Sequence, residues 1–345
     1  MDRFTITKPD DCHLHVRSGE LLKLVAGHTA SQFGRAIIMP NLKPPVTSVE
    51  QAIDYRNEIL KALPEDSEFQ PLMTLYLTAA TKVEEVRKVA AAEQVMAFKY
   101  YPAGATTNSE NGVAEIESVY PVLECMEALG VPLLIHGEVT DAKYDIFDRE
   151  KIFIDMTLES IVKRFPGLRI VLEHVTTSEA VQYVAAGNPN LAATITPQHL
   201  LFNRNAILAG GIHPHFYCLP VLKRETHRQA LVQAATSGNP RFFLGTDSAP
   251  HLTVLKENSC GCAGCYTAYG ALELYAEVFE RADALHRLEG FASFYGADFY
   301  GLPRNSSTIS LQKQPWKVPD SYGEPTSSIT PLMAGEYLSW RVVSA

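Results

Sequence analysis

The stretch LRIVLEHVTTSEAVQYVAAGNPNLAATITPQ, residues 168–198, contains one complete unit of the fold that this sequence predicts. It begins with the apolar segment 168–175 and continues through 178–187, where apolar residues recur at helical spacing. It ends in the apolar and β-branched segment 191–198. Apolar strands separated by a helix are typical of parallel sheets whose faces are covered by helices. The stretch therefore predicts a strand, a helix and a parallel strand in succession.

Segments of the same kind recur along most of the chain. The predicted strands are CHLHV (12–16), RAIIMPN (35–41), LMTLYLT (72–78), VMAFKYY (95–101), VPLLIHGE (131–138), LRIVLEHV (168–175), LAATITPQ (191–198) and RFFLGTDSAPH (241–251). Sequences with helical periodicity separate them, at 49–63, 83–94, 114–129, 155–165, 178–187 and 222–237. Eight such units close a (β/α)8 barrel, so we expect an α/β TIM barrel over residues 1–302. Residues 303–345, rich in Pro, Ser and Thr, are expected to form a C-terminal extension of short strands packed on the barrel.

The composition excludes several classes of protein. The 345 residues are 46% hydrophobic and 20% charged, as in an ordinary globular protein. No apolar run approaches the roughly 18 residues that cross a bilayer, and the N-terminus lacks the pattern of a secretory signal. These features favour a cytoplasmic protein without a membrane partner. A net charge of −9 argues against nucleic acid as a partner, but one or two local arginines would still allow a small anionic substrate.

The segment DDCHLHVR, residues 10–17, places two histidines two residues apart. Because residues i and i+2 share one face of a strand, His13 and His15 are expected to point the same way, and Cys12 and Leu14 the other way. Two imidazoles at this spacing can bind one divalent cation such as zinc. Taken alone, the pair is equally consistent with ordinary surface histidines, so the rest of the chain must supply further ligands.

Polar residues at the ends of other predicted strands supply them. Active-site residues of such barrels lie at the carboxyl ends of the strands. The residues expected there are His13, His15, Lys99, His136, His174 and Asp247. Each could be structural by itself, but together they favour a metal centre. Lysine is the unusual member: a buried lysine loses its proton readily, and the neutral amine can take up carbon dioxide to give a carbamate that bridges two cations.

We therefore expect two ions at the mouth of the barrel. The first would bind His13, His15 and Asp247, the second would bind His136 and His174, and carboxylated Lys99 and a hydroxide would bridge them. In two-metal sites the ions lie roughly 3.5 to 4 Å apart and bring the pKa of a shared water near neutrality. Asp247 would accept the proton of the attacking hydroxide and return it, as a general base and acid.

Longer motifs extend along nearly the whole chain. They are PDDCHLHVR, AIIMPNLKPPVT, FKYYPA, ATTNS, LLIHGEVT, LEHVTT, LAATITPQHL, HFYCLPVLKR, LGTDSAPH and CGCAGC. This set resembles the amidohydrolase superfamily and, within it, the single-function bacterial dihydroorotases; the match is weakest near the C-terminus. The resemblance implies two zinc ions per subunit, a homodimer, and the reversible interconversion of N-carbamoyl-L-aspartate and L-dihydroorotate in pyrimidine synthesis.

A second group of residues at the predicted barrel mouth favours a small carboxylate substrate. Arg17 shares the face of His15, and a guanidinium can bind a carboxylate through paired hydrogen bonds. Asn41 ends the second predicted strand, and His251 lies four residues beyond Asp247. The resemblance implies that Arg17, Asn41 and His251 bind the ring carboxylate. It also implies substrate contacts from His15, His136, the backbone of Leu219 and Ala263, and Thr106 and Thr107 in a mobile loop with its hinge near Gly104.

Several interpretations stay open. Cys260, Cys262 and Cys265 are spaced as in structural zinc or iron–sulfur sites, but with only three thiols close together free cysteines are favoured. His213 and His215 form a second HxH pair that Pro214 and the preceding glycines disfavour as a metal site, and His199 is a candidate to support the ligands. The alternative functions are a cyclic amidase acting on hydantoin or allantoin, and an inactive amidohydrolase-like binding protein.

Overall fold

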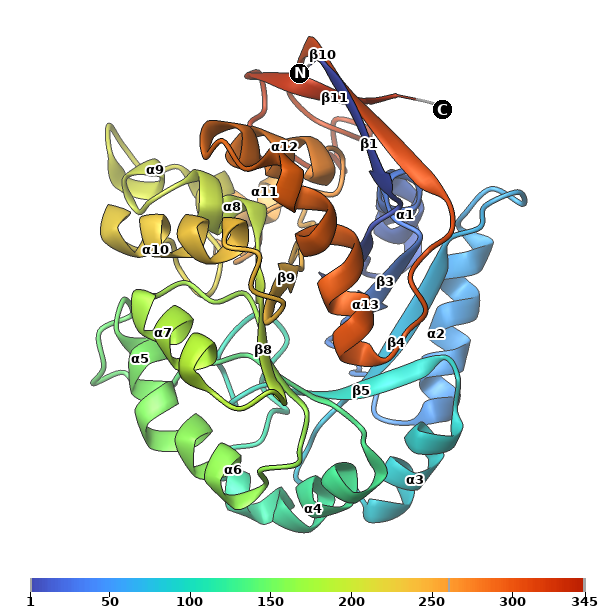
Figure 1. The fold of residues 1–345 in the computed structure, drawn as a ribbon, viewed down its shortest axis with the longest axis vertical. Helices are drawn as coiled ribbons and strands as arrows, with labels where there is room; N and C mark the ends of the chain where they lie inside the picture. Colours follow the sequence, from blue (N-terminus) through green and yellow to red (C-terminus); the bar gives the residue numbers. More distant parts are fainter. Residues whose placement is uncertain (1, 260, 344–345) are drawn as a thin grey trace.

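The computed structural model describes residues 2–259 and 261–343, and its central feature is an eight-stranded parallel barrel (Figure 1). Its strands are β2 (Asp10–Leu14), β3 (Arg35–Ile38), β4 (Gln70–Tyr76), β5 (Val95–Tyr100), β6 (Leu133–Ile135), β7 (Ile170–Leu172), β8 (Leu191–Ile195) and β9 (Phe242–Leu244). The strands are ordered in the sheet as they are along the chain. A bridge between Leu14 and Ser248, and a 2.9 Å hydrogen bond from Asp247 N to His13 O, join the last strand to the first. All eight predicted strands, and the TIM-barrel fold, are confirmed.

Helices surround the barrel (Figure 1). They are α1 (Gly19–Gln32), α2 (Val49–Lys61), α3 (Val83–Ala91), α4 (Tyr120–Leu129), α5 (Arg149–Phe153), α6 (Glu159–Arg164), α7 (Ser178–Ala186), α8 (Pro197–Leu201), α9 (Asn205–Leu208), α10 (Glu225–Thr236), α11 (Thr253–Lys256), α12 (Ala271–Arg281) and α13 (Tyr295–Tyr300). A capping box formed by Ser48 and Gln51 fixes the start of α2. No helix in the described part of the chain is long and apolar enough to cross a membrane.

The interior of the barrel is filled by one apolar side chain from each of the eight strands. This inner cluster contains Cys12, Ile37, Leu72, Ala97, Leu134, Val171, Ala192 and Phe243, all at most 8% exposed. Cys12 was expected to point away from His13, and that prediction is wrong. The pairing of β2 with β3 shifts register between Asp11 and Leu14, so β2 carries one extra residue, as in a β-bulge. Leu14 packs with the outer core, as expected, whereas Cys12 packs inside.

A separate antiparallel sheet joins the two ends of the described chain. It contains β1 (Arg3–Thr7), β10 (Thr308–Lys317) and β11 (Tyr337–Val343), with β10 in the centre. Trp340 anchors this sheet: its ring lies 5.0 Å from that of Phe4, and its Nε1 donates to Glu280 of α12. Strands were expected after residue 302, but β1 was not, and β10 is longer than the short strands expected. A domain boundary at residue 302 stays a prediction.

Candidate active site

The six predicted metal ligands all lie at the carboxyl ends of barrel strands. His13 and Lys99 are the penultimate residues of β2 and β5, and His136 follows β6 directly. His174 and Asp247 come two and three residues after β7 and β9, and both have positive φ angles, of 41° and 45°. All six side chains are buried. The fold therefore brings together residues that are far apart in sequence, at the end of the barrel where catalysis is expected.

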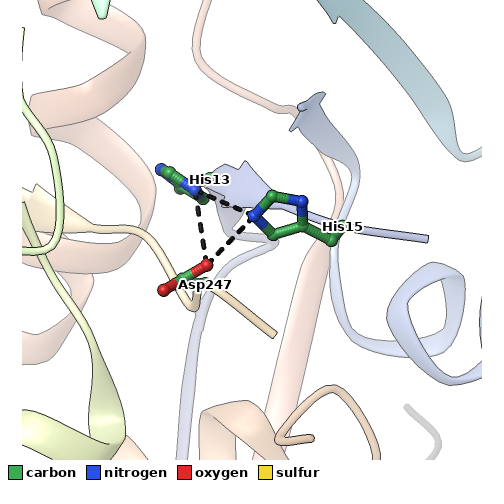
Figure 2. Close-up of side chains that lie close together, drawn as sticks. All are labelled: His13, His15 and Asp247. Carbon is green, nitrogen blue, oxygen red and sulfur yellow. Dashed lines mark hydrogen bonds and ion pairs between the residues drawn. The ribbon is translucent and has the colours of Figure 1, made fainter. Parts of the chain in front are cut away.

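His13, His15 and Asp247 form a compact group (Figure 2). Asp247 Oδ1 lies 3.4 Å from His13 Nε2 and 3.1 Å from His15 Nε2, and the two imidazole nitrogens lie 3.4 Å apart. Burial lowers the pKa of His15 to about 3, so its ring is neutral and keeps a lone pair for a metal. Burial would raise the pKa of Asp247, but the nearby histidines outweigh it and hold that pKa at about 2. The group thus offers two imidazoles and a carboxylate, which is a donor set that zinc accepts.

The other three ligands lie beside this group. The ring centroids of His136 and His174 are 4.7 Å apart, and those of His174 and His13 are 5.1 Å apart. Lys99 Nζ is buried and has no hydrogen-bond partner among the described residues. Burial lowers the pKa of Lys99 to about 8. Its Nζ lies 5.1 Å from the centroid of the Tyr101 ring. A buried amine without a hydrogen bond is costly, and a modification or a ligand that supplies hydrogen bonds would reduce that cost.

A small, largely closed cavity lies above these side chains. Of the predicted site residues, its lining includes His13, His15, Arg17, Asn41, Thr106, Thr107, His136, His174, Leu219, Asp247 and Ala263. Two predicted residues do not line it: Lys99 lies completely buried, and His251 lies against Arg17. Tyr101, Ala249 and Gly264 line it without having been predicted.

Arg17 and His251 form the polar end of the cavity. Arg17 Nη2 lies 3.0 Å from His251 Nε2, and Arg17 Nε donates to Pro250 O at 3.1 Å. Burial lowers the pKa of His251 to about 2, so His251 is neutral and Arg17 carries the positive charge. The guanidinium is thus held in place beside the metal-ligand group, where it can bind an anionic group of a substrate.

The loop after β5 contacts both Asn41 and the CGCAGC segment. Asn41 Nδ2 donates to Thr107 O at 3.1 Å, and Asn108 Nδ2 donates to Asn41 O at 3.0 Å. Thr107 Oγ1 donates to Ala263 O at 3.4 Å. Gly104 has a φ of 80° and open space around it, as suits the predicted hinge. The loop therefore lies against the cavity and is joined to its walls by these hydrogen bonds.

The cysteine-rich segment is organised by a lysine. Lys256 Nζ donates to the carbonyl oxygens of Tyr217, Cys262 and Gly264, at 3.1, 2.9 and 2.6 Å. Cys262 and Cys265 are free thiols, as favoured from the sequence, and Cys260 lies outside the described residues. Lys256 was not predicted, because a lysine in a short helix gives no signal that it will be buried.

The second HxH pair forms contacts outside the ligand group. His213 Nε2 bonds to Ala209 O and His215 Nε2 to Glu257 Oε1. Within residues 2–259 and 261–343, the group of His13, His15 and Asp247 is the one set of three that could hold a metal. His199 bonds through Nε2 to Pro220 O, next to Leu219 in the cavity wall, and its suggested role in supporting the ligands stays a prediction.

Two buried glutamates were missed from the sequence. Glu173 Oε2 lies 2.9 Å from His13 Nδ1, and Glu138 Oε2 lies 2.8 Å from His136 Nε2. Both glutamates are only 1% exposed. Each follows or precedes a predicted ligand closely in the sequence, which is the signal that could have identified them.

Comparison with known proteins agrees with this geometry. A model of the Amidohydrolase family matches residues 10–335. The dihydroorotase of Acaryochloris marina is 61% identical over 343 residues, which is 99% of each chain. The structure of dihydroorotase from Saccharomyces cerevisiae in complex with 5-fluoroorotic acid is 33% identical, with a TM-score of 0.92 over 99% of both chains. L-hydantoinase from Arthrobacter aurescens, at 16% identity, a TM-score of 0.80 and coverage of 98% of this chain and 82% of that one, shares the fold alone. The chain belongs to the amidohydrolase family and, within it, to the dihydroorotases.

Proposed function

We propose that this chain catalyses the reversible cyclisation of N-carbamoyl-L-aspartate to L-dihydroorotate. One observation carries the proposal: four histidines, Asp247 and the amine of Lys99 meet beside a cavity whose other end carries Arg17. The first group suits hydrolysis of an amide, and the guanidinium suits a substrate with a carboxylate. Dihydroorotate combines a cyclic amide with a ring carboxylate. A hydantoin or allantoin ring has no carboxylate for Arg17, and an inactive relative would not need the whole set of ligands.

The donor set fits two zinc ions. We assign His13, His15 and Asp247 to one ion and His136 and His174 to the other, with carboxylated Lys99 shared between them. The fit rests on the donor atoms of the first group, which all lie within 4.8 Å of one another, and on the unpartnered amine of Lys99. Bound divalent ions supply polarisation of a carbonyl oxygen and a lower pKa for the attacking water.

Lys99 is suited to carboxylation because of its pKa. With a pKa of about 8, part of the side chain is neutral at pH 7.5. The neutral Nζ forms a bond to the carbon of carbon dioxide and releases one proton, so a neutral amine becomes an anionic carbamate with two oxygen donors. This change gives the buried side chain the negative charge that two cations require.

The substrate is oriented by the polar end of the cavity. We assign its ring carboxylate to Arg17 and His251, and to the side chain of Asn41 once that side chain turns from Thr107. Leu219 and Ala263 line the cavity, and we assign their backbone groups to the remainder of the ring. Thr106 and Thr107 close the cavity and exclude bulk water.

Asp247 moves the proton. Its Oδ1 faces both histidines, which leaves Oδ2 as the oxygen that we assign to proton transfer. In hydrolysis Oδ2 would take the proton of the attacking hydroxide and give it to the leaving ring nitrogen. In cyclisation it would take the proton from the carbamoyl nitrogen and give it to the carboxylate oxygen that departs as hydroxide.

The test combines a metal count with turnover. Purified protein should contain about two divalent ions per chain, as two-metal hydrolases do, and should convert dihydroorotate and N-carbamoyl-aspartate into each other. Hydantoin, tested in parallel, should react far more slowly because it lacks the carboxylate. Faster turnover of hydantoin, or no turnover by metal-replete protein, would contradict the proposal. Cytoplasmic location and a homodimer stay predictions; the mass of the protein in solution tests the dimer.

A further inference from the structure

Glu173 lies beside the ligand group, yet none of the steps above uses it. Its side chain is completely buried, and its Oε2 lies 2.9 Å from His13 Nδ1. The other ring nitrogen, His13 Nε2, lies 3.4 Å from Asp247 Oδ1 and faces the ligand group. Glu173 therefore contacts the nitrogen of His13 that is turned away from the proposed metal.

Thr194 determines how the protons in this contact are arranged. The backbone N–H of His174 donates to Thr194 Oγ1 at 2.7 Å, and Thr194 Oγ1 donates to Glu173 Oε2 at 2.5 Å. A hydroxyl has one proton to give, and Thr194 gives it to Glu173. The contact between His13 Nδ1 and Glu173 is an ion-pair distance and not one of the hydrogen bonds among the described residues. Because the carboxylate already accepts from Thr194, we assign the ring proton of His13 to Nδ1, the nitrogen that faces the carboxylate. The lone pair of His13 is then at Nε2, where it points to the ligand group.

We propose that Glu173 is a positioning residue that holds His13 with Nδ1 protonated and Nε2 free, and so strengthens binding of the metal. A carboxylate on the distal nitrogen of a metal-binding imidazole fixes the ring and raises its basicity, and its loss typically costs about 10-fold to 100-fold in metal affinity. Through Thr194 the same network reaches the backbone of His174, so it connects ligands of both proposed ions. This inference rests on the proposed function, since it requires a metal at the site.

Close packing leaves this network little room to rearrange. A Cβ at Gly245 would lie 2.7 Å from Thr194 Cβ and 3.1 Å from His13 Cβ. The backbone just after β9 therefore lies so close to Thr194 and His13 that any residue other than glycine at position 245 would clash with them. Glu173, at 1% exposure, has no solvent to turn toward.

The chain offers a matched control in Glu150. This carboxylate is also buried, at 2% exposure, and accepts hydrogen bonds from the backbone and hydroxyl groups of Thr176 and Thr177. Those two threonines follow His174 closely, but the hydrogen bonds of Glu150 among the described residues go to the threonines and not to a predicted ligand. Removing the charge of Glu150 therefore tests the general cost of altering a buried glutamate near the site.

The experiment measures metal binding directly. Metal-free parent, Glu173→Gln and Glu150→Gln proteins are titrated with Zn²⁺ in competition with a chromophoric chelator, and the visible spectrum of each Co²⁺ form is recorded. Glu173→Gln should bind zinc about 10-fold more weakly or worse and should show a changed cobalt spectrum, while Glu150→Gln should match the parent in both. Parental zinc affinity and cobalt spectrum in Glu173→Gln would overturn the proposal, even if that variant unfolds more easily.

A second pair of variants decides the matter if Glu173→Gln does not fold. Thr194→Ser keeps the hydroxyl, and Thr194→Val removes it at nearly the same size. Weaker zinc binding in Thr194→Val alone would support the network, and equal binding in the two variants would overturn it. Failure of the parent to bind zinc would contradict the proposed function itself. Equal zinc binding by the parent and Glu173→Gln would contradict only the role of Glu173.

Discussion

Two layers of side chains fill the barrel, and they lie only two residues apart along the same strands. The lower layer contains Ala97, Leu134, Val171 and Ala192, and the upper layer contains Lys99, His136, Glu173 and Thr194. The lower layer is apolar, and its burial stabilises the folded protein. The upper layer buries polar groups, which costs free energy wherever partners are lacking. The residues that stabilise the barrel and the residues proposed for catalysis therefore lie two positions apart on the same strands. Substitutions in the lower layer should mainly change stability, and substitutions in the upper layer should mainly change metal binding and turnover.

The largest effect should come from Asp247→Asn, at the mouth of the polar layer. With a pKa of about 2, Asp247 is ionised and can accept a proton, whereas an amide cannot. Loss of a general base typically lowers turnover by about 10² to 10⁴. We expect such a fall in kcat, with most of the zinc retained and the midpoint of thermal unfolding close to that of the parent. Turnover near the parental value would remove Asp247 from proton transfer.

Leu134→Ala tests the apolar layer, two residues before His136. Leu134 is completely buried, and truncation of such a leucine costs about 2 to 5 kcal/mol. Denaturant unfolding should show this loss, while zinc content and kcat stay near the parental values. The matched change in the polar layer, His136→Leu, should instead reduce the zinc content without a comparable loss of stability. If Leu134→Ala lost zinc as readily as His136→Leu, the two layers would not be separate in function.

The sequence was sufficient to predict the barrel strands and, of the polar layer, Lys99 and His136 but not Glu173 or Thr194. Alternation of apolar segments with helical ones located the strands, and the residues at their ends included all six proposed ligands. Glu173 was missed because strand alternation puts residues 173 and 174 on opposite faces. The structure brings both to the site, since the positive φ of His174 redirects the chain. The inward position of Cys12 was missed for a similar reason, because a bulge in β2 does not show in the order of residue types.

Pairings between strands far apart along the chain also could not be predicted from the sequence. The strand β1 is five residues long and is followed by no helix, so it lacked the pattern that identified the barrel strands. Its partner, β10, lies about 300 residues away along the chain, as in the pairing of Thr5 with Ser310. Which edge pairs with which depends on tertiary packing, and local periodicity carries no information about it.

The pH dependence of stability measures what burial of Lys99, a member of the polar layer, costs in free energy of unfolding. Burial lowers its pKa from 10.5 to about 8 in the folded protein. Between these values the unfolded chain binds more protons, so stability should rise with pH in this window and be independent of this group below it. In zinc-free protein without carbon dioxide, the free energy of unfolding should increase by at most about 2 kcal/mol from pH 8 to 9.5 relative to Lys99→Met. Identical pH dependence in the two proteins would show that the amine is not buried at a cost.

The smallest effect should come from the loop above the polar layer. Asn108 donates to Asn41 O and has a φ of 57°, a conformation that asparagine tolerates better than alanine. One neutral hydrogen bond contributes about 0.5 to 1.5 kcal/mol, so Asn108→Ala should raise KM by roughly 2-fold to 10-fold with little change in kcat or stability.

Two further variants separate the causes of that effect. Asn108→Gly removes the hydrogen bond but accepts the left-handed backbone, so a KM between those of parent and Asn108→Ala would show that both the bond and the backbone hold the loop closed. Asn111, exposed in the same loop, provides the control, and Asn111→Ala should keep the parental KM. An unchanged KM in Asn108→Ala would mean that loop closure does not depend on this contact. The positions of the site residues would then depend on the apolar and polar layers alone.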